Sequence, residues 1–463
     1  MGEYTRRMNL KIELDLWDWA EGSKKDTLVI TNSVLNYRFQ KSIKTPKGSC
    51  QLAMIPQSVA THILDIVNPM DVVKISEFGT LKFIGFIQRI SYTGSIGRDG
   101  KPARQATITA SQYGGLLMDA TIGFGLGTAL GAIEDELASG AALLYKAIAD
   151  GVKDGVSYAE ILTLLIDNFR TYLVTLKAEN FVTYLEEYLD TSTGLTSAKT
   201  PLLPRSFELY NGTEQSLTFW HVAEQLVQKP FNEFWIDNGP RKVNIDGDVV
   251  ELPAKSCFVF RETPFDGTVG GVSGNQLFTG IDPIYIDQDH FLRFDLARSM
   301  DEVYSVYSVK EAAFKLDDII RMLTGQWVVD VARIGKYLFK PLITELFYTR
   351  VEKLEEAAVE EQTGTFETAG REAAETLQAW FGNNDEYLSG AISHMVPLDN
   401  ALDPKIGDKV SVYGIDGFFY VEGIAHTWTY QGPLQSSLTV TRGYNRASRI
   451  ELKDRIFRRN QIR

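Results

Sequence analysis

Apolar and polar positions divide the chain into β-rich and helical blocks. From about Leu28 to Ser111, short β-branched and aromatic runs such as LVITNSVLNYRF and LKFIGFIQRISYT alternate with turn residues, which predicts an antiparallel sheet or barrel. The next residues, about 121–200, place apolar side chains at helical spacing after a capping box at Ser157. We therefore expect this second block to be helical.

The second half of the chain repeats this alternation. Residues Thr218–Gln228 predict a short helix that leads into strands, which makes the middle of the chain α+β. A second helical block is predicted over ITELFYTRVEKLEEAAVEE and TAGREAAETLQAWF, where Phe347, Val351 and Leu354 form an apolar stripe. Strands are predicted to resume from Gly390 to Arg442.

The strands near the two ends of the chain form an internal repeat. The segment MDVVKISEFGTLKFIGFIQRISYT from Met70 aligns, with one gap, with GDKVSVYGIDGFFYVEGIAHTWTY from Gly407. This alignment matches Asp71 with Asp408, Val73 with Val410, Gly85 with Gly423, Gln88 with His426, Ile90 with Trp428 and Tyr92 with Tyr430. Each segment is followed by a turn and a Thr-rich strand. The shared order of elements predicts a duplicated β domain.

Composition narrows the class of protein. A chain of 463 residues with 44% hydrophobic residues is long enough for several packed domains. Its net charge of -13 argues against wrapping nucleic acid as a main role. Cys50 and Cys257 are too few for a disulfide framework and lack metal-binding spacing, so a reducing compartment is expected. No signal peptide is recognisable, and the 13-residue stretch TIGFGLGTALGAI is shorter than a membrane span, so we expect a soluble protein made in the cytoplasm.

The C-terminal residues are basic in an otherwise acidic chain. The segment from Arg442 to Arg463 contains eight Lys or Arg residues and only two acidic residues, Glu451 and Asp454, which gives a local charge of +6. One interpretation is a solvated helix end. The interpretation we favour is that this tail docks on an acidic partner or lies near a channel.

The sequence contains few groups of residues that could form a catalytic or metal-binding site. The histidines are scattered and form no zinc motif. Asp287, Asp289 and His290 lie together, but a solvated turn is favoured there because the Gly and distal Glu of a calcium loop are missing. The stretch GFGLGTALG lacks the Lys-Ser/Thr of a phosphate loop.

Glu422 and His426 are the remaining pair of side chains that could form a catalytic or metal-binding site. Four residues apart on a strand, they lie roughly 13 Å apart, too far to share a ligand unless Gly423 makes a bulge. We therefore predict no catalytic, cofactor-binding or metal-binding residues, and expect the protein not to be an enzyme.

A family resemblance rests on three stretches. IGDKVSVYGIDGFFYVEGIAHTWTYQGPLQSSLTVTRG resembles the closing β domain of baseplate hub proteins from contractile phage tails and tailocins. FWHVAEQLVQKPFNEFWIDN followed by FVFRETPF is similar to the family's helix, Pro-Phe-x-Glu strand and Arg-x-x-Pro-Phe segment, here Pro230, Phe231, Glu233, Arg261, Pro264 and Phe265. LVITNSVLNYRFQKSIKTPKGSCQLAM resembles the family's opening strands.

The resemblance implies an α+β, mainly β fold with two tube-like antiparallel β-barrel domains, an α+β connection and two helical insertions. The expected boundaries are 1–120 for the first barrel, 121–205 for a helical insertion, 206–300 for the connecting domain, 301–389 for a strand and the second insertion, 390–446 for the second barrel and 447–463 for the basic tail. The candidate structural and interface residues are Gln88, Tyr92, Glu233, Arg261, Glu422, His426, Trp428, Arg442, Arg455, Arg458 and Arg459.

The function implied is structural. A homotrimer would adapt the sixfold tail tube to the threefold central spike and contact other baseplate proteins and the tape measure protein. It would assemble in the bacterial cytoplasm and belong to the virion or tailocin particle, without a membrane or sequence-specific nucleic acid. Two alternatives stay open: a tail-tip hub of a non-contractile tail, or a tail-associated protein that binds or hydrolyses peptidoglycan or other glycans.

Overall fold

The structure is a computed structural model, and it describes most of the strands and part of the helices. The described residues are 9–18, 21–55, 66–96, 102–119, 156–175, 183–189, 199–200, 218–227, 229–238, 241–245, 248–252, 254–265, 282–311, 327–346, 371, 373–397 and 402–442.

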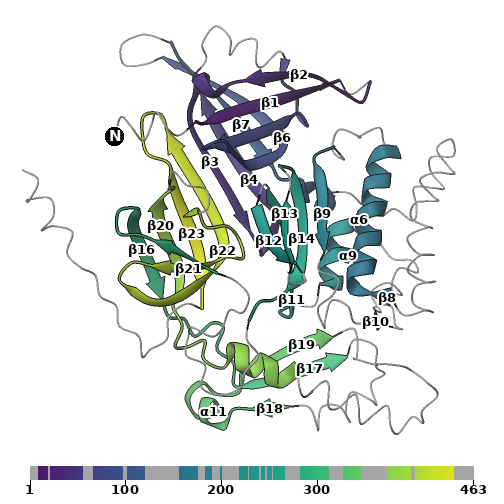
Figure 1. Cartoon of the computed structure of the whole chain (residues 1–463), viewed down its shortest axis with the longest axis vertical. Coiled ribbons are helices and arrows are strands. Elements are labelled where there is room, and N and C mark those ends of the chain that lie inside the picture. The colour runs from purple at the N-terminus through teal and green to yellow at the C-terminus, as the bar shows by residue number, and fades with distance from the viewer. Residues whose placement is uncertain are drawn as a thin grey trace, which may run out of the picture.

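One 13-stranded sheet contains both predicted β units (Figure 1). The first β unit comprises β1 (Lys11–Asp18), β2 (Ser23–Val29), β3 (Val34–Ser42), β4 (Thr45–Met54), β5 (Val72–Glu77), β6 (Thr80–Ile96) and β7 (Pro102–Ser111). The second β unit comprises β15 (Pro283–Ile286), β16 (Phe291–Ala297), β20 (Ser389–Met395), β21 (Lys409–Val412), β22 (Ile415–Thr429) and β23 (Gln435–Thr441). The α+β, mainly β fold class is confirmed.

The two β units share the sheet through one strand pair. The strand order is β16-β20-β23-β22-β3-β4-β7-β6-β5-β1-β2, with β21 pairing β22 and β15. Strands β3 and β22 pair antiparallel from Asn36 with Thr429 to Ser42 with Gly423. We call this pairing the seam. The pairing of β15 and β16 with β21 and β20 also places these two strands in the second unit rather than in the connecting domain.

The duplication is visible in backbone hydrogen bonds that recur in both units. The Ile87 amide donates to the Asp71 carbonyl at 2.8 Å, and the Val421 amide donates to the Asp408 carbonyl at 3.0 Å. Each aspartate carboxylate also accepts from the amide three residues earlier, at 2.8 Å for Asp71 and 2.7 Å for Asp408. The same turn therefore opens the same hairpin twice.

The register of the repeat differs from the sequence alignment. In the first unit Val72 pairs with Phe86, and in the second Lys409 pairs with Tyr420, so the second hairpin is three residues shorter (14 minus 11). The sequence alignment, whose one gap makes the second hairpin a residue longer, therefore shifts every later match.

The corrected matches follow from the two β-bulges. A register shift isolates Gln88 between Ile87 and Arg89, and another isolates Glu422 between Val421 and Gly423. The counterpart of Gln88 is therefore Glu422 and not His426. By the same count Tyr92 corresponds to His426, Gly85 to Phe419 and Ile90 to Ile424.

Each β unit has its own apolar core, and each core is completed by a neighbour. The first core is built on strands β1 to β7 but also contains Trp428 from β22. The second core contains Phe419 and Val421 from β22 together with Trp235 and Cys257 from the middle of the chain. Burying these side chains across element boundaries favours fixed relative positions of the parts.

The middle of the chain forms a small sheet covered by helices on one side (Figure 1). Strands β11 (Asn232–Asn238), β14 (Ser256–Glu262) and β9 (Leu185–Leu189) lie in that sheet, and α6 (Tyr158–Thr175), α9 (Phe219–Leu226) and α3 (Gly114–Asp119) are its neighbouring helices. The predicted helices near 158 and 218 are confirmed. Strand β9 lies within the segment predicted as a helical insertion, and it pairs parallel with β14. Short pairs β8 (Val156–Ser157) with β10 (Lys199–Thr200) and β12 (Arg241–Ile245) with β13 (Asp248–Leu252) complete this part.

A third part contains β17 (Val306–Glu311), β18 (Val328–Val329), α11 (Val331–Tyr337) and β19 (Pro341–Leu346). The helix predicted to start at ITEL is wrong there, because Ile343 and its neighbours pair parallel with β17 and a partner strand overrides local helical propensity. Residues 347–370 lie outside the described residues. The second half of the predicted block is confirmed, since residues 373–381 are helical.

The corrected register makes a testable distinction between two glycines that the sequence alignment equates. A Cβ at Gly85 would lie 2.2 Å from the Ser111 carbonyl oxygen, whereas a Cβ at Gly423 would lie 3.2 Å from the Lys41 carbonyl oxygen. We expect Gly85→Ala to lower the free energy of unfolding by about 1–3 kcal/mol. Gly423→Ala is expected to lower it by less than about 1 kcal/mol. Urea unfolding of both variants is the measurement, and equal losses would contradict the register.

Candidate functional site: polar junctions between the β units

Buried polar side chains connect the parts of the chain at several junctions. The first lies behind the seam, where His426 of β22 reaches the first β unit. Its Nδ1 lies 2.8 Å from Glu77 Oε2, and the Tyr37 hydroxyl donates to Glu77 Oε1 at 2.7 Å. The three side chains are 2% exposed or less. Glu77 therefore has a partner on each oxygen, which a buried carboxylate needs.

The rings around His426 belong to the strand that faces it. His426 pairs with Phe39 in the seam register, and their ring centroids lie 4.8 Å apart. Two residues further, Trp428 pairs with Tyr37, with ring centroids at 5.7 Å. The candidates His426 and Trp428 thus lie in the core of the first unit, although their strand belongs to the second.

A second buried pair lies beside His426. Lys82 Nζ lies 2.5 Å from Asp403 Oδ2, and His426 Nε2 lies 3.9 Å from Asp403 Oδ1. Burial raises the pKa of Asp403, but Lys82 and His426 outweigh it and lower this pKa to about 2. Asp403 belongs to the second unit's loop and Lys82 to β6, so the ion pair also connects the two units.

A third junction joins the middle sheet to the second β unit. The Tyr420 hydroxyl donates to Glu233 at 2.5 Å and 2.6 Å to its two oxygens. Arg261 donates to Glu233 Oε2 at 3.1 Å, to the Tyr420 hydroxyl at 3.0 Å and to the Gly407 carbonyl at 3.1 Å. Its guanidinium lies 4.9 Å from the Trp235 ring centroid. Glu233 and Arg261, which the family resemblance singled out, are therefore direct partners in the structure.

The opposite end of β11 contacts the first β unit. Gln112 donates to the Asn238 side chain at 2.9 Å, and Lys41 Nζ lies 3.4 Å from Asp237 Oδ1. These polar side chains are buried. One strand thus has its first residues against Tyr420 and its last residues against the first unit.

The first unit also holds the middle part through a buried carboxylate. Asp15 accepts from the Tyr184 hydroxyl at 2.6 Å and pairs with Lys74 at 2.5 Å and Lys24 at 2.9 Å. Burial raises the pKa of Asp15, but these donors outweigh burial and lower it to about 2. Tyr184 immediately precedes β9 in the chain.

The candidate Arg442, counted in the local charge of +6 but placed within the expected second barrel, is buried. Its guanidinium is sandwiched between the rings of Phe265 and Phe381, at 4.4 Å and 4.3 Å. It also donates to the Trp380 carbonyl at 2.5 Å. Burial lowers the pKa of Arg442, although Glu422 and Glu302 act in the opposite direction.

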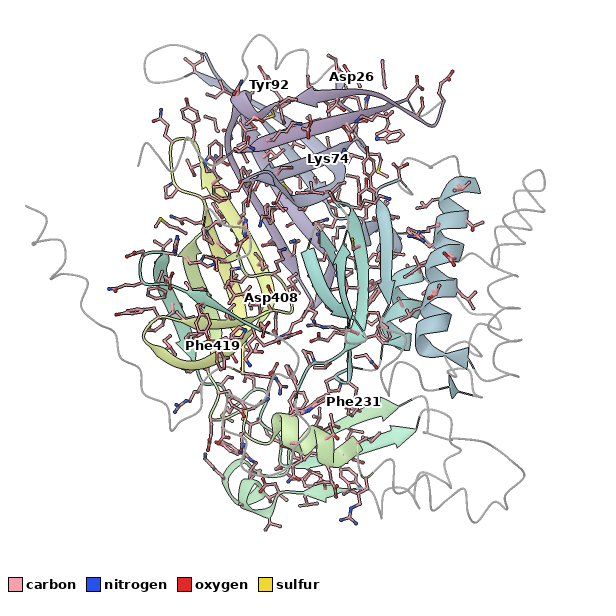
Figure 2. All side chains as sticks on the ribbon, in the orientation of Figure 1. Asp26, Lys74, Tyr92, Phe231, Asp408 and Phe419 are labelled. Atoms are coloured by element: carbon pink, nitrogen blue, oxygen red, sulfur yellow. The ribbon has the colours of Figure 1, made fainter. Side chains whose placement is uncertain are left out.

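The remaining candidates are dispersed. Gln88 and Tyr92 are exposed on β6, and Tyr92 lies at the outer end of the first unit (Figure 2). Glu422 pairs with Lys44 at 2.8 Å and does not share a partner with His426. Arg455, Arg458 and Arg459, the glycine-rich stretch GFGLGTALG and the apolar run from Thr121 lie outside the described residues.

The candidate cation position is a tight turn. The backbone amides of His290 and Phe291 donate to the Asp287 carbonyl at 3.1 Å and 3.0 Å, between β15 and β16. Among the residues that the structure describes, no group of three His, Cys, Asp or Glu side chains is arranged to hold a metal ion. No helix in the described ranges is long and apolar enough to cross a membrane.

Sequence reasoning missed Glu77, Lys82, Asp403 and Tyr420. Glu77 and Asp403 were two among 60 acidic residues. One signal was available for Glu77: it alternates with Val73 and Ile75 on β5 and so falls on the buried face. A carboxylate on an apolar face predicts a buried partner, although not which one.

The lowered pKa of Asp403 predicts a pH dependence of stability. Its carboxylate stabilises the folded state above the unfolded pKa of about 3.9, and this contribution is lost as the pH falls through about 2. We expect Asp403→Asn to lower the free energy of unfolding at pH 7 by about 2 kcal/mol. The variant should also lose less stability than the wild type between pH 5 and pH 2.

Asp295→Asn serves as the control, because this carboxylate is 76% exposed. Denaturant unfolding at a series of pH values should give it the wild-type profile. An Asp403→Asn variant with the wild-type acid dependence would contradict the assignment.

The hydroxyl of Tyr420 can be tested separately. Tyr420→Phe keeps the ring but removes the group that donates to Glu233 and accepts from Arg261. We expect a loss of about 1–3 kcal/mol in the free energy of unfolding, because the buried ion pair loses a hydrogen-bonding partner. Tyr285→Phe, at a tyrosine that is 60% exposed, should change it by less than about 0.5 kcal/mol. Equal effects in thermal or urea unfolding would show that the Tyr420 hydroxyl does not stabilise the junction.

Comparison with known proteins gives structural similarity only. No protein-family model matches the chain, and no curated protein matches it in sequence. The fold is similar to the tail protein from Neisseria meningitidis MC58, with 11% identity over 93% of this chain and 96% of that one, at a TM-score of 0.49. It is also similar to the 43 kDa tail protein of prophage MuSo2 from Shewanella oneidensis, with 12% identity over 93% and 97% of the chains, at 0.46. An E. coli type VI secretion component shares 7% identity over 91% and 76%, at 0.38. Two of these three similar structures are thus tail proteins, and the third is a secretion-system component.

Proposed function

We propose that the protein is the central hub of a contractile-tail baseplate and forms a homotrimer that adapts a sixfold tail tube to a threefold spike. The observation that carries this proposal is the duplication within one chain. Two β units open with the same aspartate turn and lie in one continuous sheet. Three copies of a chain with two such units would supply six, which resolves the mismatch between threefold and sixfold symmetry.

Such an adaptor requires its two units to be rigidly connected. They are joined directly by the seam, the Glu77–His426 contact and the Lys82–Asp403 pair. Strand β11 also connects them, because it contacts Tyr420 of the second unit and Gln112 of the first. Shifting one unit against the other would leave buried charges without partners, which costs several kcal/mol. The spacing of the two units is therefore maintained within each chain.

Surfaces that suit further partners are present around α11. Val331, Leu338 and Phe339 are 77%, 76% and 61% exposed, and Leu338 adopts a left-handed backbone with φ of 67°. Exposed clusters of large apolar side chains mark protein interfaces. We assign this region to contacts with other baseplate proteins, and the basic tail with Arg455, Arg458 and Arg459 to an acidic partner such as the spike.

The proposed partners are thus the tail tube, the spike, other baseplate proteins and the tape measure protein. The protein would assemble in the bacterial cytoplasm and remain in the particle. Its role is structural and requires no catalytic group.

The oligomeric state tests this proposal. Native mass spectrometry of the purified full chain should give a species of three times 51.9 kDa, and electron microscopy of the parent particle should show three copies with their β units in a ring of six. The appearance of the tail in those images also shows whether the particle is contractile or non-contractile. A stable monomer without threefold assembly in the particle, or a cleared band on a cell-wall zymogram, would overturn the proposal.

A further inference from the structure

The sheet face opposite the two cores is polar across the seam. One cross-strand row runs over six strands from β23 to β6 and consists of Gln435, Thr427, Arg38, Gln51, Thr109 and Arg89. The next row consists of Ser437, Ala425, Gln40, Ser49 and Ser111 and ends at the buried Phe86 on β6. Neither row contains a carboxylate, in a chain that has 60 acidic residues and a net charge of -13. The six strands span roughly 24 Å at about 4.8 Å per strand.

A groove of about 360 Å³ lies on this face at the seam. Its cations are Arg38 and Lys47, and its hydroxyl groups include those of Ser42, Thr45 and Thr427. Lys41 also borders the groove, but its ammonium is buried beside Asp237. None of the described residues that line the groove is acidic, and none is aromatic. The lining thus offers hydrogen-bond donors and positive charge, the combination that recognises phosphate oxygens.

Among the residues that the structure describes, Arg38 and Lys47 have no acidic partner. Within the described part of the chain, no carboxylate lies within 4 Å of the cationic groups of Arg38 or Lys47. Their neighbours differ, since Lys41 pairs with Asp237 and Lys44 pairs with Glu422. Arg89, further along the same row, has no such partner among the described residues either. These charges are therefore available to an external anion.

We propose that this groove binds the phosphodiester backbone of a nucleic acid without reading its sequence. Arg38 provides a planar fork for two phosphate oxygens, Lys47 a point charge, and the Ser and Thr hydroxyls further donors. The absence of aromatic side chains from the described lining leaves no platform on which bases could stack, so single and double strands bind by charge alone. The acidic remainder of the chain keeps this binding local and weak. The inference stands independently of the proposed hub function.

Fluorescence anisotropy of the full chain with labelled single-stranded and double-stranded DNA of mixed sequence tests this inference. We expect the wild type to bind both at 50 mM salt and to lose affinity as salt rises. The double variant Arg38→Gln with Lys47→Gln should bind at least about tenfold more weakly. Its slope of log K against log salt should be shallower by about 1.8 for double-stranded DNA and by about 1.4 for single-stranded DNA, because two phosphate contacts at about 0.9 or 0.7 each are removed.

The matched control carries Lys11→Gln with Lys25→Gln, which removes the same charge from the strands β1 and β2 at the far edge of the sheet. It should bind like the wild type. The basic C-terminal tail is present in all three proteins, so it does not account for a difference between them. Thermal unfolding should be unchanged in both variants, because the substituted side chains are exposed.

Competition identifies the class of ligand. Inorganic polyphosphate should displace the labelled DNA, and polyglutamate of equal charge should displace it far less. The inference is overturned if the wild type does not bind DNA or if the groove variant and the control bind equally well. Displacement by polyglutamate as effective as by polyphosphate also overturns it, and would assign the groove to an acidic polypeptide.

Discussion

The pairing of β3 with β22 is the constraint on which the rest of the architecture depends. It converts two separate β units into one sheet, and its register decides which side chains are buried. In the observed register Tyr37 and Phe39 lie on the core side beside Trp428 and His426, while Arg38 and Thr427 lie on the polar side. A slip by one residue would exchange the two faces, bury Arg38 and expose Phe39. Burial therefore excludes every slip of the seam by an odd number of residues.

Buried ionic groups add a second level of specificity to this pairing. A slip by two residues would keep apolar side chains on the core side, whereas Glu77 is satisfied only when His426 and Tyr37 are both in place. The Lys82–Asp403 pair imposes the same condition from another strand. Such groups contribute little net stability but penalise misalignment strongly, because any displaced partner leaves a charge in an apolar core. This behaviour suits a protein whose function depends on a fixed arrangement of its two β units.

Much of this could be predicted from the sequence, but only where the information is local. Alternating apolar positions and turn residues predicted the strands from Leu28 to Ser111 and from Gly390 to Arg442, and these are confirmed. The duplication was also recognisable, because Asp71 and Asp408 open both hairpins. The helix predicted at ITEL was wrong because β17, some 35 residues earlier, provides a parallel partner that a local pattern does not reveal.

The junctions could not be predicted for the same physical reason. Glu77 and His426 are 349 residues apart, and Glu233 and Tyr420 are 187 apart, so no spacing rule connects them. The resemblance identified Glu233 and Arg261 as notable residues, but their shared contact with Tyr420 depends on the placement of whole sheets. The register of the repeat failed at a hairpin whose length changed by three residues, which no aligned side chain marks.

The corrected repeat also explains why the two copies differ chemically while their backbones agree. The aspartate turns make the same backbone hydrogen bonds to their own hairpins in both copies, and Asp71 also accepts from the Trp17 amide of β1 at 3.0 Å. His426 and its counterpart Tyr92 have different surroundings, because β3 lies beside β22 whereas β5 and β7 lie beside β6. The residue at the seam is buried against Glu77, and its counterpart is 45% exposed at the outer end of the other unit. Position in the sheet, rather than descent from a common repeat, thus determines which copy carries the buried polar junction.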